Sequence, residues 1–389
     1  MVNIFENIVN RKNTNSVKWD LNETIFGKSD VIPMWVADMD FKAPEEVLNA
    51  LKEVVDHGVF GYPTRTDSYY NAIIRWFGIY HEWKIEKNWI SFSPGVVPGL
   101  KIAINALTNP GDKILIQTPV YYPFYEVIKN NERKIVKNEM IYTDSGYIMD
   151  FEDLEDKFKD DKMKLFILCS PHNPVGRVWK KEELKKIADL AEKYGKIVIS
   201  DEIHADLVYK GFKHIPFQKI SEYVKNNTIT FTAPSKTFNI AGLETANAII
   251  PNKELKELFE KTKTRYSSDL TNIFGIRGLE AAYNYGRDWL DELIWYLEEN
   301  IDFIDEYFKS NIPQIKFFKP EGTYLLWLDM RELGDEETVK DILINKAGVG
   351  LEEGSIFGEG GKGFFRMNIA TTRKIIEKAL NNMNEAFNN

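Results

Sequence analysis

The sequence predicts an α/β fold in which a parallel sheet carries helices on both faces, followed by a smaller α+β unit. Continuous apolar runs, typical of strands buried on both faces, occur at residues 113–118, 164–170, 196–200 and 228–232. Between the second and third runs, one apolar face recurs at helical spacing and consists of Leu184, Ile187, Ala188 and Ala191. This helix ends at Gly195, and its length suits a βαβ crossover.

A helix is predicted before these strands and a different pattern after them. Apolar residues at helical spacing and a following glycine predict a helix from Pro44 to His57. Beyond about residue 286 the periodicity predicts a long helix over 287–310, a strand over 323–328 and a final helix around 375–383. The glycine-rich stretch 354–363 is expected to be a loop.

We therefore expect three parts. They are an N-terminal arm with part of the small domain (1–48), a large α/β domain (49–286) and a small C-terminal α+β domain (287–389).

Composition excludes several classes of protein. Fifty basic against 59 acidic residues give a net charge of −9, which disfavours nucleic acid and anionic membranes as partners. The single cysteine, Cys169, can form neither an internal disulfide nor a zinc-binding thiolate cluster. No apolar run approaches the roughly 20 residues of a membrane-spanning helix, so we expect a cytoplasmic protein.

Four polar or aromatic residues follow the apolar runs, where a parallel sheet presents its carboxyl edge and binds ligands. These residues are Tyr121, Asn173, Asp201 and Lys236. A lysine directly beyond a buried strand is unusual, although a solvated surface lysine is the ordinary alternative.

The motifs around these residues resemble a known family. SPHNPVG, SDEIH and TAPSKTFNIAG, in this order, are similar to the pyridoxal-phosphate enzymes of the class I/II aminotransferase superfamily, which have fold type I. TNSVKWD, PMWVADMDF, GYPTRTDSYY, SDEIHADLVY and SKTFNIAGL most resemble its branch of cystathionine β-lyases, or carbon–sulfur β-lyases. The resemblance implies a mostly parallel, seven-stranded type of sheet, pyridoxal 5'-phosphate as cofactor, and a homodimer that shares its active sites.

Two residues would carry the chemistry by this resemblance. Lys236 matches the Schiff-base lysine, which holds the cofactor and then acts as the catalytic base toward the substrate α-proton. Asp201 would keep the pyridine nitrogen protonated, because a nearby opposite charge favours the charged form. The alternative for Asp201 is an N-cap of a short helix near Ile203.

Other residues would bind the cofactor. Asn173 would donate to its phenolic oxygen, or else be a turn residue before a proline. Tyr121 would stack on its ring, or else be a core aromatic. The amides of Gly95, Val96 and Val97 would form a helix N-terminus under the phosphate.

The chain departs from the aminotransferase pattern near the phosphate. Ser235 and Thr232 supply hydroxyls there, but Glu244 stands where aminotransferases have an arginine. By resemblance, Tyr62 of the neighbouring subunit would donate instead, unless it is merely a turn aromatic. His204 replaces a cofactor-binding tyrosine and could contact the cofactor or be structural.

The substrate side is expected to include Arg366, Ala37, Tyr121 and Asn173. Arg366 matches the arginine that binds the α-carboxylate through its planar fork, the alternative being a salt-bridged surface arginine. Ala37 stands where many relatives carry glycine. No metal is expected, because the five histidines show no ligand spacing.

The resemblance therefore implies a pyridoxal-phosphate-dependent lyase. It would cleave L-cystathionine, or a related cysteine thioether, into a thiol, pyruvate and ammonia. The enzymatic alternative is a class I/II aminotransferase on the same scaffold, and the non-enzymatic alternative is a regulatory protein that retains the fold.

Overall fold

The computed structural model describes residues 4–388 of the chain. At its centre lies a sheet of seven strands in the order β2-β10-β9-β8-β7-β3-β4. The strands are β2 (Ile90–Ser93), β3 (Lys113–Thr118), β4 (Lys134–Glu139), β7 (Met163–Cys169), β8 (Ile197–Asp201), β9 (Thr228–Thr232) and β10 (Ala246–Ile249). Within this sheet β10 is antiparallel to both neighbours and the other pairs are parallel. The expected mostly parallel sheet is confirmed.

Helices cover both faces of the sheet, which explains the continuous apolar sequences of its strands. Ile114 and Ile116 face one apolar cluster and Leu115 faces another, because successive side chains of a strand point to opposite faces. The first face carries α5 (Val96–Leu107), α6 (Pro123–Lys129) and α10 (Lys253–Arg265). The second face carries α7 (Phe151–Phe158), α8 (Lys181–Lys193) and α9 (Glu222–Asn226). The predicted crossover helix is α8.

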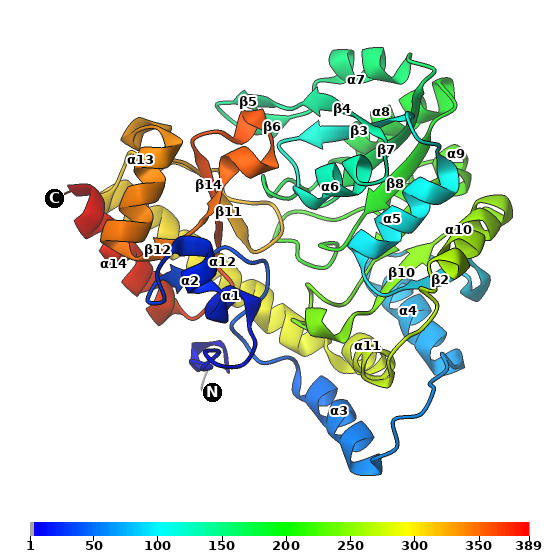
Figure 1. Ribbon diagram of the computed structural model, residues 1–389, viewed down its shortest axis with the longest axis horizontal. Coiled ribbons are helices and arrows are strands. Elements are labelled where there is room, and N and C mark those ends of the chain that lie inside the picture. The colour runs from blue at the N-terminus through cyan, green and yellow to red at the C-terminus, as the bar shows by residue number, and fades with distance from the viewer. Residues whose placement is uncertain (1–3, 389) are drawn as a thin grey trace.

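A smaller group of C-terminal elements lies to the left in Figure 1. Its antiparallel sheet has the order β11-β14-β13. The group consists of β11 (Leu325–Asp329), β13 (Glu352–Glu353), β14 (Phe364–Asn368), α12 (Arg287–Asn311), α13 (Glu336–Asp341), a π-helical turn (Ile342–Ala347) and α14 (Arg373–Asn388). The predicted long helix, strand and final helix are therefore confirmed.

The N-terminal arm joins this C-terminal group. β1 (Ile32–Pro33) pairs in parallel with β12 (Val349–Gly350). The expected division into three parts, with boundaries at residues 48 and 286, stays a prediction. The other short elements are α1 (Val17–Asp20), α2 (Asn22–Phe26), β5 (Ile141–Thr143) and β6 (Gly146–Ile148).

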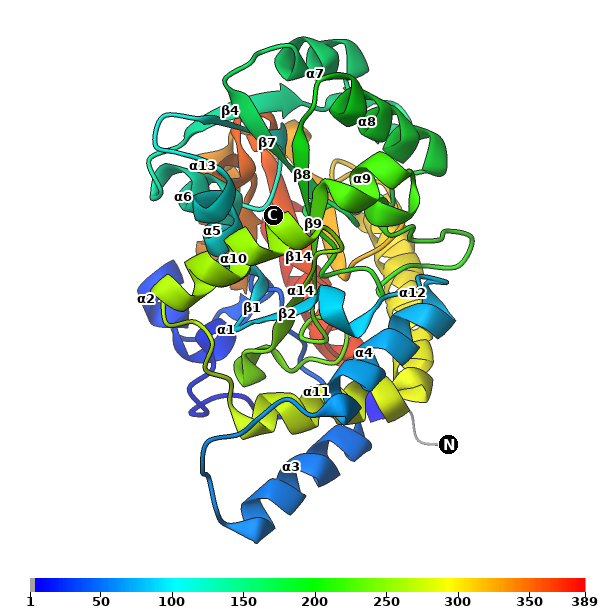
Figure 2. The same ribbon diagram turned by 90° about the vertical axis from the view of Figure 1, so that its right-hand side faces the viewer.

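The helix predicted after Pro44 is α3 (Glu45–His57). It ends where Gly58 takes a φ of 73°, a left-handed conformation that glycine adopts without steric cost. α3 packs on α11 (Ile273–Tyr285), which also packs on α4 (Asp67–Tyr80). Figures 1 and 2 both place α3 at the lower end of the molecule.

The glycine-rich stretch 354–363 differs from the expected loop, because it contains two 3-10 turns, Gly354–Phe357 and Glu359–Gly361. The two turns pack closely: a Cβ on Gly354 would lie 2.0 Å from the carbonyl oxygen of Gly361. The glycines at these positions therefore allow the two turns to approach each other closely, because a side chain would not fit between their backbones.

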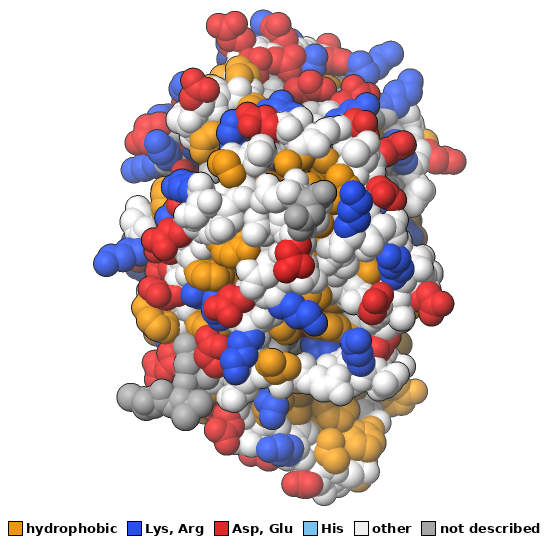
Figure 3. Space-filling view, turned by 90° about the vertical axis from the view of Figure 1, so that its left-hand side faces the viewer, with side chains coloured by type: hydrophobic (Ala, Val, Ile, Leu, Met, Phe, Trp, Pro, Cys, Tyr) orange, Lys and Arg blue, Asp and Glu red, His pale blue; other side chains and the backbone are white. Residues whose placement is uncertain are grey.

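The outer surface carries charges of both signs. Figure 3 shows acidic and basic side chains interspersed over the face that it draws. None of the helices between residues 4 and 388 is long and apolar enough to cross a membrane.

Candidate active site

The large sheet brings the sequence-predicted residues to one edge. β3, β7, β8 and β9 are parallel, so the segments that follow them begin at the same edge. The antiparallel β10 begins there, since Asn247 pairs with Thr232 at the end of β9. A cavity of about 210 Å³ opens at this edge.

Most of the predicted residues line this cavity. They are Ala37, Gly95, Val96, Val97, Tyr121, Asn173, Asp201, His204, Ser235 and Lys236. Three predicted residues do not line it: Thr232, Arg366 and Tyr62. Arg366 is hydrogen-bonded to Asn173, a residue of the cavity wall: Asn173 Oδ1 accepts from Arg366 Nη1 at 3.1 Å. Tyr62 is 99% exposed.

Lys236 lies in the loop after β9 and is half-buried. Its Nζ donates a hydrogen bond of 2.6 Å to the carbonyl oxygen of Ala37, which also accepts one of 2.9 Å from the hydroxyl of Tyr324. Burial lowers the pKa of the Lys236 amine to about 8, while the carboxylates of Asp38 and Asp201 act in the opposite direction. The amine is therefore a stronger candidate for a base or nucleophile near neutral pH than an exposed lysine.

Asp201 ends β8 with its carboxylate inside the cavity wall. Burial raises the pKa of this carboxyl to about 7, although the backbone N–H of Ile203 donates to Oδ1 at 3.1 Å. The residues after Asp201 form turns rather than a helix. Asp201 is therefore not the N-cap of a helix, and that alternative is wrong. A cationic partner would stabilise the carboxylate here.

His204 follows three residues later and is also buried. Burial lowers the pKa of its imidazole to about 3, so the ring is neutral at physiological pH. Its Nδ1 has no hydrogen-bond partner within the described residues. The same holds for the buried Oγ1 of Thr232. These atoms leave unused hydrogen-bonding capacity close to the cavity.

The N-terminus of α5 forms another wall. Gly95 is the N-cap residue, and Val96 and Val97 are the first two helical residues. Their N–H groups precede the first N–H that donates within the helix, because the earliest bond of this turn runs from the Gly99 N–H to the Gly95 carbonyl oxygen. Free N–H groups and the positive end of the helix dipole favour an anion such as a phosphate.

Arg366 lies in β14 and is 2% exposed. Its Nη2 donates to the carbonyl oxygen of Trp35 at 2.8 Å and to the carboxylate of Glu352 at 3.2 Å. Its guanidinium also lies 4.9 Å from the ring centroid of Phe357. The alternative of a solvent-exposed salt bridge is therefore wrong, because the arginine is buried and fixed on several sides.

The segment 35–41 is held along the cavity by its backbone carbonyls. Besides Arg366 and Lys236, the side chain of Asn368 donates to the carbonyls of Val36 and Asp38. The side chain of Asn239 donates to those of Met39 and Phe41. Residues from two distant parts of the chain, 236–239 and 366–368, thus fix one segment.

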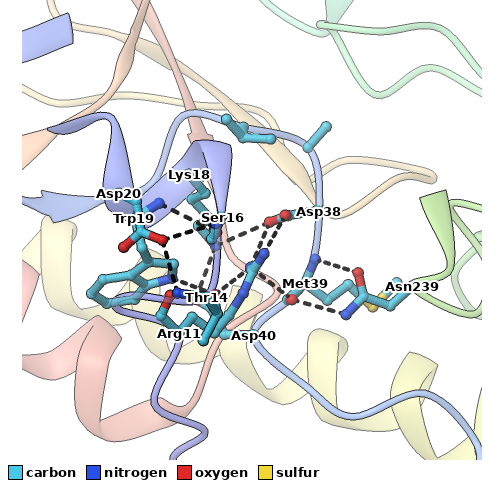
Figure 4. A network of polar contacts seen from close by, with 12 residues as sticks. Arg11, Thr14, Ser16, Lys18, Trp19, Asp20, Asp38, Met39, Asp40 and Asn239 are labelled. Atoms are coloured by element: carbon cyan, nitrogen blue, oxygen red, sulfur yellow. Dashed lines mark hydrogen bonds and ion pairs between the residues drawn. The ribbon is translucent and has the colours of Figure 1, made fainter. Parts of the chain in front are cut away.

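Figure 4 shows how the N-terminal arm fastens the same segment. Arg11 contacts both carboxylate oxygens of Asp38, at 2.6 and 2.8 Å. Arg11 and Lys18 each form an ion pair of 2.9 Å with the buried Asp40, and Trp19 donates to it at 2.8 Å. These bonds compensate the cost of burying the Asp40 carboxylate.

Sequence reasoning missed Tyr324, Asn239 and Glu352. Tyr324 and Asn239 act on backbone carbonyls of the segment 35–41, a kind of contact that has no local sequence signal. Glu352 belongs to a strand of two residues, too short to show periodicity. Among residues 4–388, no group of three His, Cys, Asp or Glu side chains is placed to hold a metal ion.

Comparison with known proteins identifies the family. A family model described as aminotransferase class I and II matches residues 29–383. The chain belongs to the aminotransferase class I and II family.

The chain is similar to several named proteins over nearly its whole length. Cystathionine beta-lyase PatB of Bacillus subtilis (strain 168) is 42% identical over 384 residues, which are 98% of this chain and 99% of PatB. Cystalysin from Treponema denticola, solved with pyridoxal 5'-phosphate, has a TM-score of 0.97 and 42% identity, covering 100% of this chain and 99% of cystalysin. The pyridoxal-phosphate-bound C–S lyase from Staphylococcus hominis has a TM-score of 0.92 and 34% identity, covering 98% and 97%.

The cavity of this family member suits pyridoxal phosphate. The cofactor has an anionic phosphate, a basic ring nitrogen and an aldehyde, and the cavity has a complementary group for each. The α5 N-terminus suits the phosphate, the buried carboxylate of Asp201 suits a protonated ring nitrogen, and the amine of Lys236 suits the aldehyde.

Proposed function

We propose that the protein is a pyridoxal-phosphate-dependent carbon–sulfur β-lyase that cleaves L-cystathionine or a related cysteine thioether. One observation carries the proposal: the half-buried amine of Lys236, the buried carboxylate of Asp201 and the N-terminus of α5 all face one cavity. The relatives named for cystathionine or C–S cleavage support this choice of substrate.

Several residues would hold the cofactor. Lys236 would bind it covalently, Asp201 would pair with its ring nitrogen, and Tyr121 would stack on its ring. Asn173 and His204 would lie beside the ring. Gly95, Val96, Val97, Ser235 and Thr232 would surround the phosphate. When bound, pyridoxal phosphate accepts the electron pair that the breaking Cα–H bond leaves.

Side chains of this chain would bind the substrate and take its proton. Arg366 would bind the substrate α-carboxylate, with Asn173 and Ala37 nearby, and so fix the direction of the Cα–H bond. Lys236, once released from the cofactor, would take the α-proton, for which its lowered pKa is suited. The Cβ–S bond then breaks and the thiolate leaves. With one water, cystathionine yields homocysteine, pyruvate and ammonia.

We also propose a homodimer in which Tyr62 of one subunit reaches the phosphate of the other. Tyr62 is almost fully exposed, and the nearby Val55, Val59 and Phe60 are exposed as well. Such a cluster of apolar side chains is typical of a protein interface, and two-fold dimers are the commonest soluble assembly.

The chain's composition supports a cytoplasmic location, as its single cysteine is unpaired.

Incubation of the purified holoenzyme with cystathionine tests the proposed reaction. We expect homocysteine, pyruvate and ammonia in equal amounts without any added 2-oxo acid, and severe loss of activity in Lys236→Ala and Arg366→Ala. Product that appears only with an added 2-oxo acid, together with the amino acid made from it, would replace the lyase by an aminotransferase. A colourless protein that ignores added pyridoxal phosphate would leave only the non-enzymatic alternative.

A further inference from the structure

Glu352 lies directly opposite Arg366 in the small sheet. The two residues are register partners in the antiparallel pair β13–β14, so their side chains share one face of the sheet. Glu352 Oε2 lies 3.2 Å from Arg366 Nη2, and both side chains are largely buried. The strand register thus fixes an internal carboxylate against the arginine that we assign to the substrate carboxylate.

The hydrogen bonds of Arg366 leave little room for a second carboxylate. A guanidinium has two planar forks, Nε with Nη2 and Nη1 with Nη2, so each fork needs a hydrogen of Nη2. Nη2 already donates to the carbonyl oxygen of Trp35 and to Glu352. Nε is buried without a partner, and Nη1 donates to Asn173. Both forks are therefore incomplete while Glu352 stays in place.

Of the two groups on Nη2, Glu352 is the one able to leave. The Trp35 carbonyl belongs to the backbone segment 35–41, which Asn368, Asn239 and Arg11 fasten. Glu352 has a flexible side chain, and Arg366 is its sole charged partner within the described residues. Burial raises the pKa of the Glu352 carboxyl and Arg366 opposes this rise, so a carboxyl displaced from Arg366 takes up a proton more readily and need not stay charged.

We propose that the carboxylate of Glu352 is a built-in competitor for the α-carboxylate of the substrate. It accepts a hydrogen bond from Nη2 of Arg366 in the substrate-free protein, is displaced when an amino acid binds, and so sets the affinity of the site for carboxylates. The proposal rests on the proposed function, in which Arg366 binds the α-carboxylate.

Binding of unreactive probes to the holoenzyme tests this role. 2-Methylalanine has a carboxylate but neither an α-proton nor a β-leaving group, and isopropylamine is the matching amine without a carboxylate. Titration of the visible absorbance of the bound cofactor gives a dissociation constant for each probe. In Glu352→Gln, we expect 2-methylalanine to bind about tenfold more tightly, because a larger fraction of Arg366 is free, and isopropylamine to bind unchanged.

Two variants support the interpretation. Glu353→Gln is the matched control, because Glu353 follows Glu352 in the same strand but pairs with Lys340 at 2.6 Å; we expect no change for either probe. Glu352→Asp keeps the charge on a shorter side chain that reaches Arg366 less well, and we expect a smaller gain in the affinity for 2-methylalanine. Thermal melting verifies that each variant is folded.

The outcomes separate the two proposals. Unchanged or weaker binding of 2-methylalanine to Glu352→Gln would overturn the competitor role, and so would an equal change for both probes. If Arg366→Ala keeps the wild-type preference for 2-methylalanine over isopropylamine, the assignment of Arg366 falls and the competitor role falls with it. The products formed from cystathionine are measured separately and decide the lyase reaction on their own.

Discussion

The amine of Lys236 donates a hydrogen bond of 2.6 Å to the carbonyl oxygen of Ala37, 199 residues earlier in the chain. The same oxygen accepts from the hydroxyl of Tyr324. This contact ties the proposed catalytic lysine to the segment that passes the substrate side of the cavity. The position of the lysine therefore depends on how firmly the N-terminal part of the chain is fastened.

Covalent capture of pyridoxal phosphate by the cofactor-free protein is expected to depend on pH. The neutral amine is the nucleophile, and burial lowers the pKa of Lys236 to about 8. The rate should therefore rise as the pH rises through about 8 and level off above it. Stopped-flow absorbance measures this rate. Lys236→Ala is the control without capture, and a midpoint near that of free lysine would contradict the burial argument.

Asp201→Asn is expected to stabilise the cofactor-free protein while weakening cofactor binding. Burial raises the pKa of this carboxyl from 3.8 to about 7 in the folded state. The folded state then holds the proton more tightly than the unfolded state, so stability falls as the pH rises from about 4 to 7. The difference corresponds to at most about 4 kcal/mol above pH 7.

Urea unfolding at pH 4 and pH 8 measures this effect on the cofactor-free protein. The stabilisation by Asp201→Asn should be present at pH 8 and nearly absent at pH 4. Asp189→Asn, at an exposed ion pair with Lys185, should change little at either pH. Equal stabilisation by Asp201→Asn at both pH values would mean that ionisation of the Asp201 carboxyl does not destabilise the folded protein.

Lys18→Met is expected to lower the free energy of unfolding by about 3 kcal/mol, because it leaves the buried carboxylate of Asp40 with one cation fewer. Lys185→Met removes an exposed ion pair and should cost less than about 1 kcal/mol. Denaturant unfolding of the holoenzyme compares the two. If Lys18→Met lowers the free energy of unfolding no more than Lys185→Met does, Arg11 alone is enough to stabilise the buried carboxylate of Asp40.

Tyr62→Phe is expected to weaken the retention of pyridoxal phosphate without dissociating the dimer. The change removes one hydroxyl, whose hydrogen bond is worth about 1.5 to 3 kcal/mol when it donates to a charged group. Equilibrium dialysis measures the cofactor and light scattering the mass. Tyr285→Phe, at another exposed tyrosine, is the control. A fully active monomer would refute the shared site.

Much of the fold could be predicted from the sequence because its signals are local. The strands β3, β7, β8 and β9 are buried on both faces, and this burial requires the apolar runs from which they were predicted. The polar residues at their ends share one edge because the strands are parallel. The antiparallel direction of β10 and the 3-10 turns of 354–363 depend on packing and left no such pattern.

The sequence alone thus predicted four strands of the large sheet, four helices and several residues that line the cavity. The tertiary structure decided which groups those residues meet. Lys236 meets Ala37, and Arg366 meets Glu352, across long stretches of sequence. The contact between Arg366 and Glu352 follows from the register of a two-residue strand, and that of Lys236 from a segment held by backbone hydrogen bonds. Neither kind of bond depends on a repeating side-chain pattern, so only the folded chain reveals them.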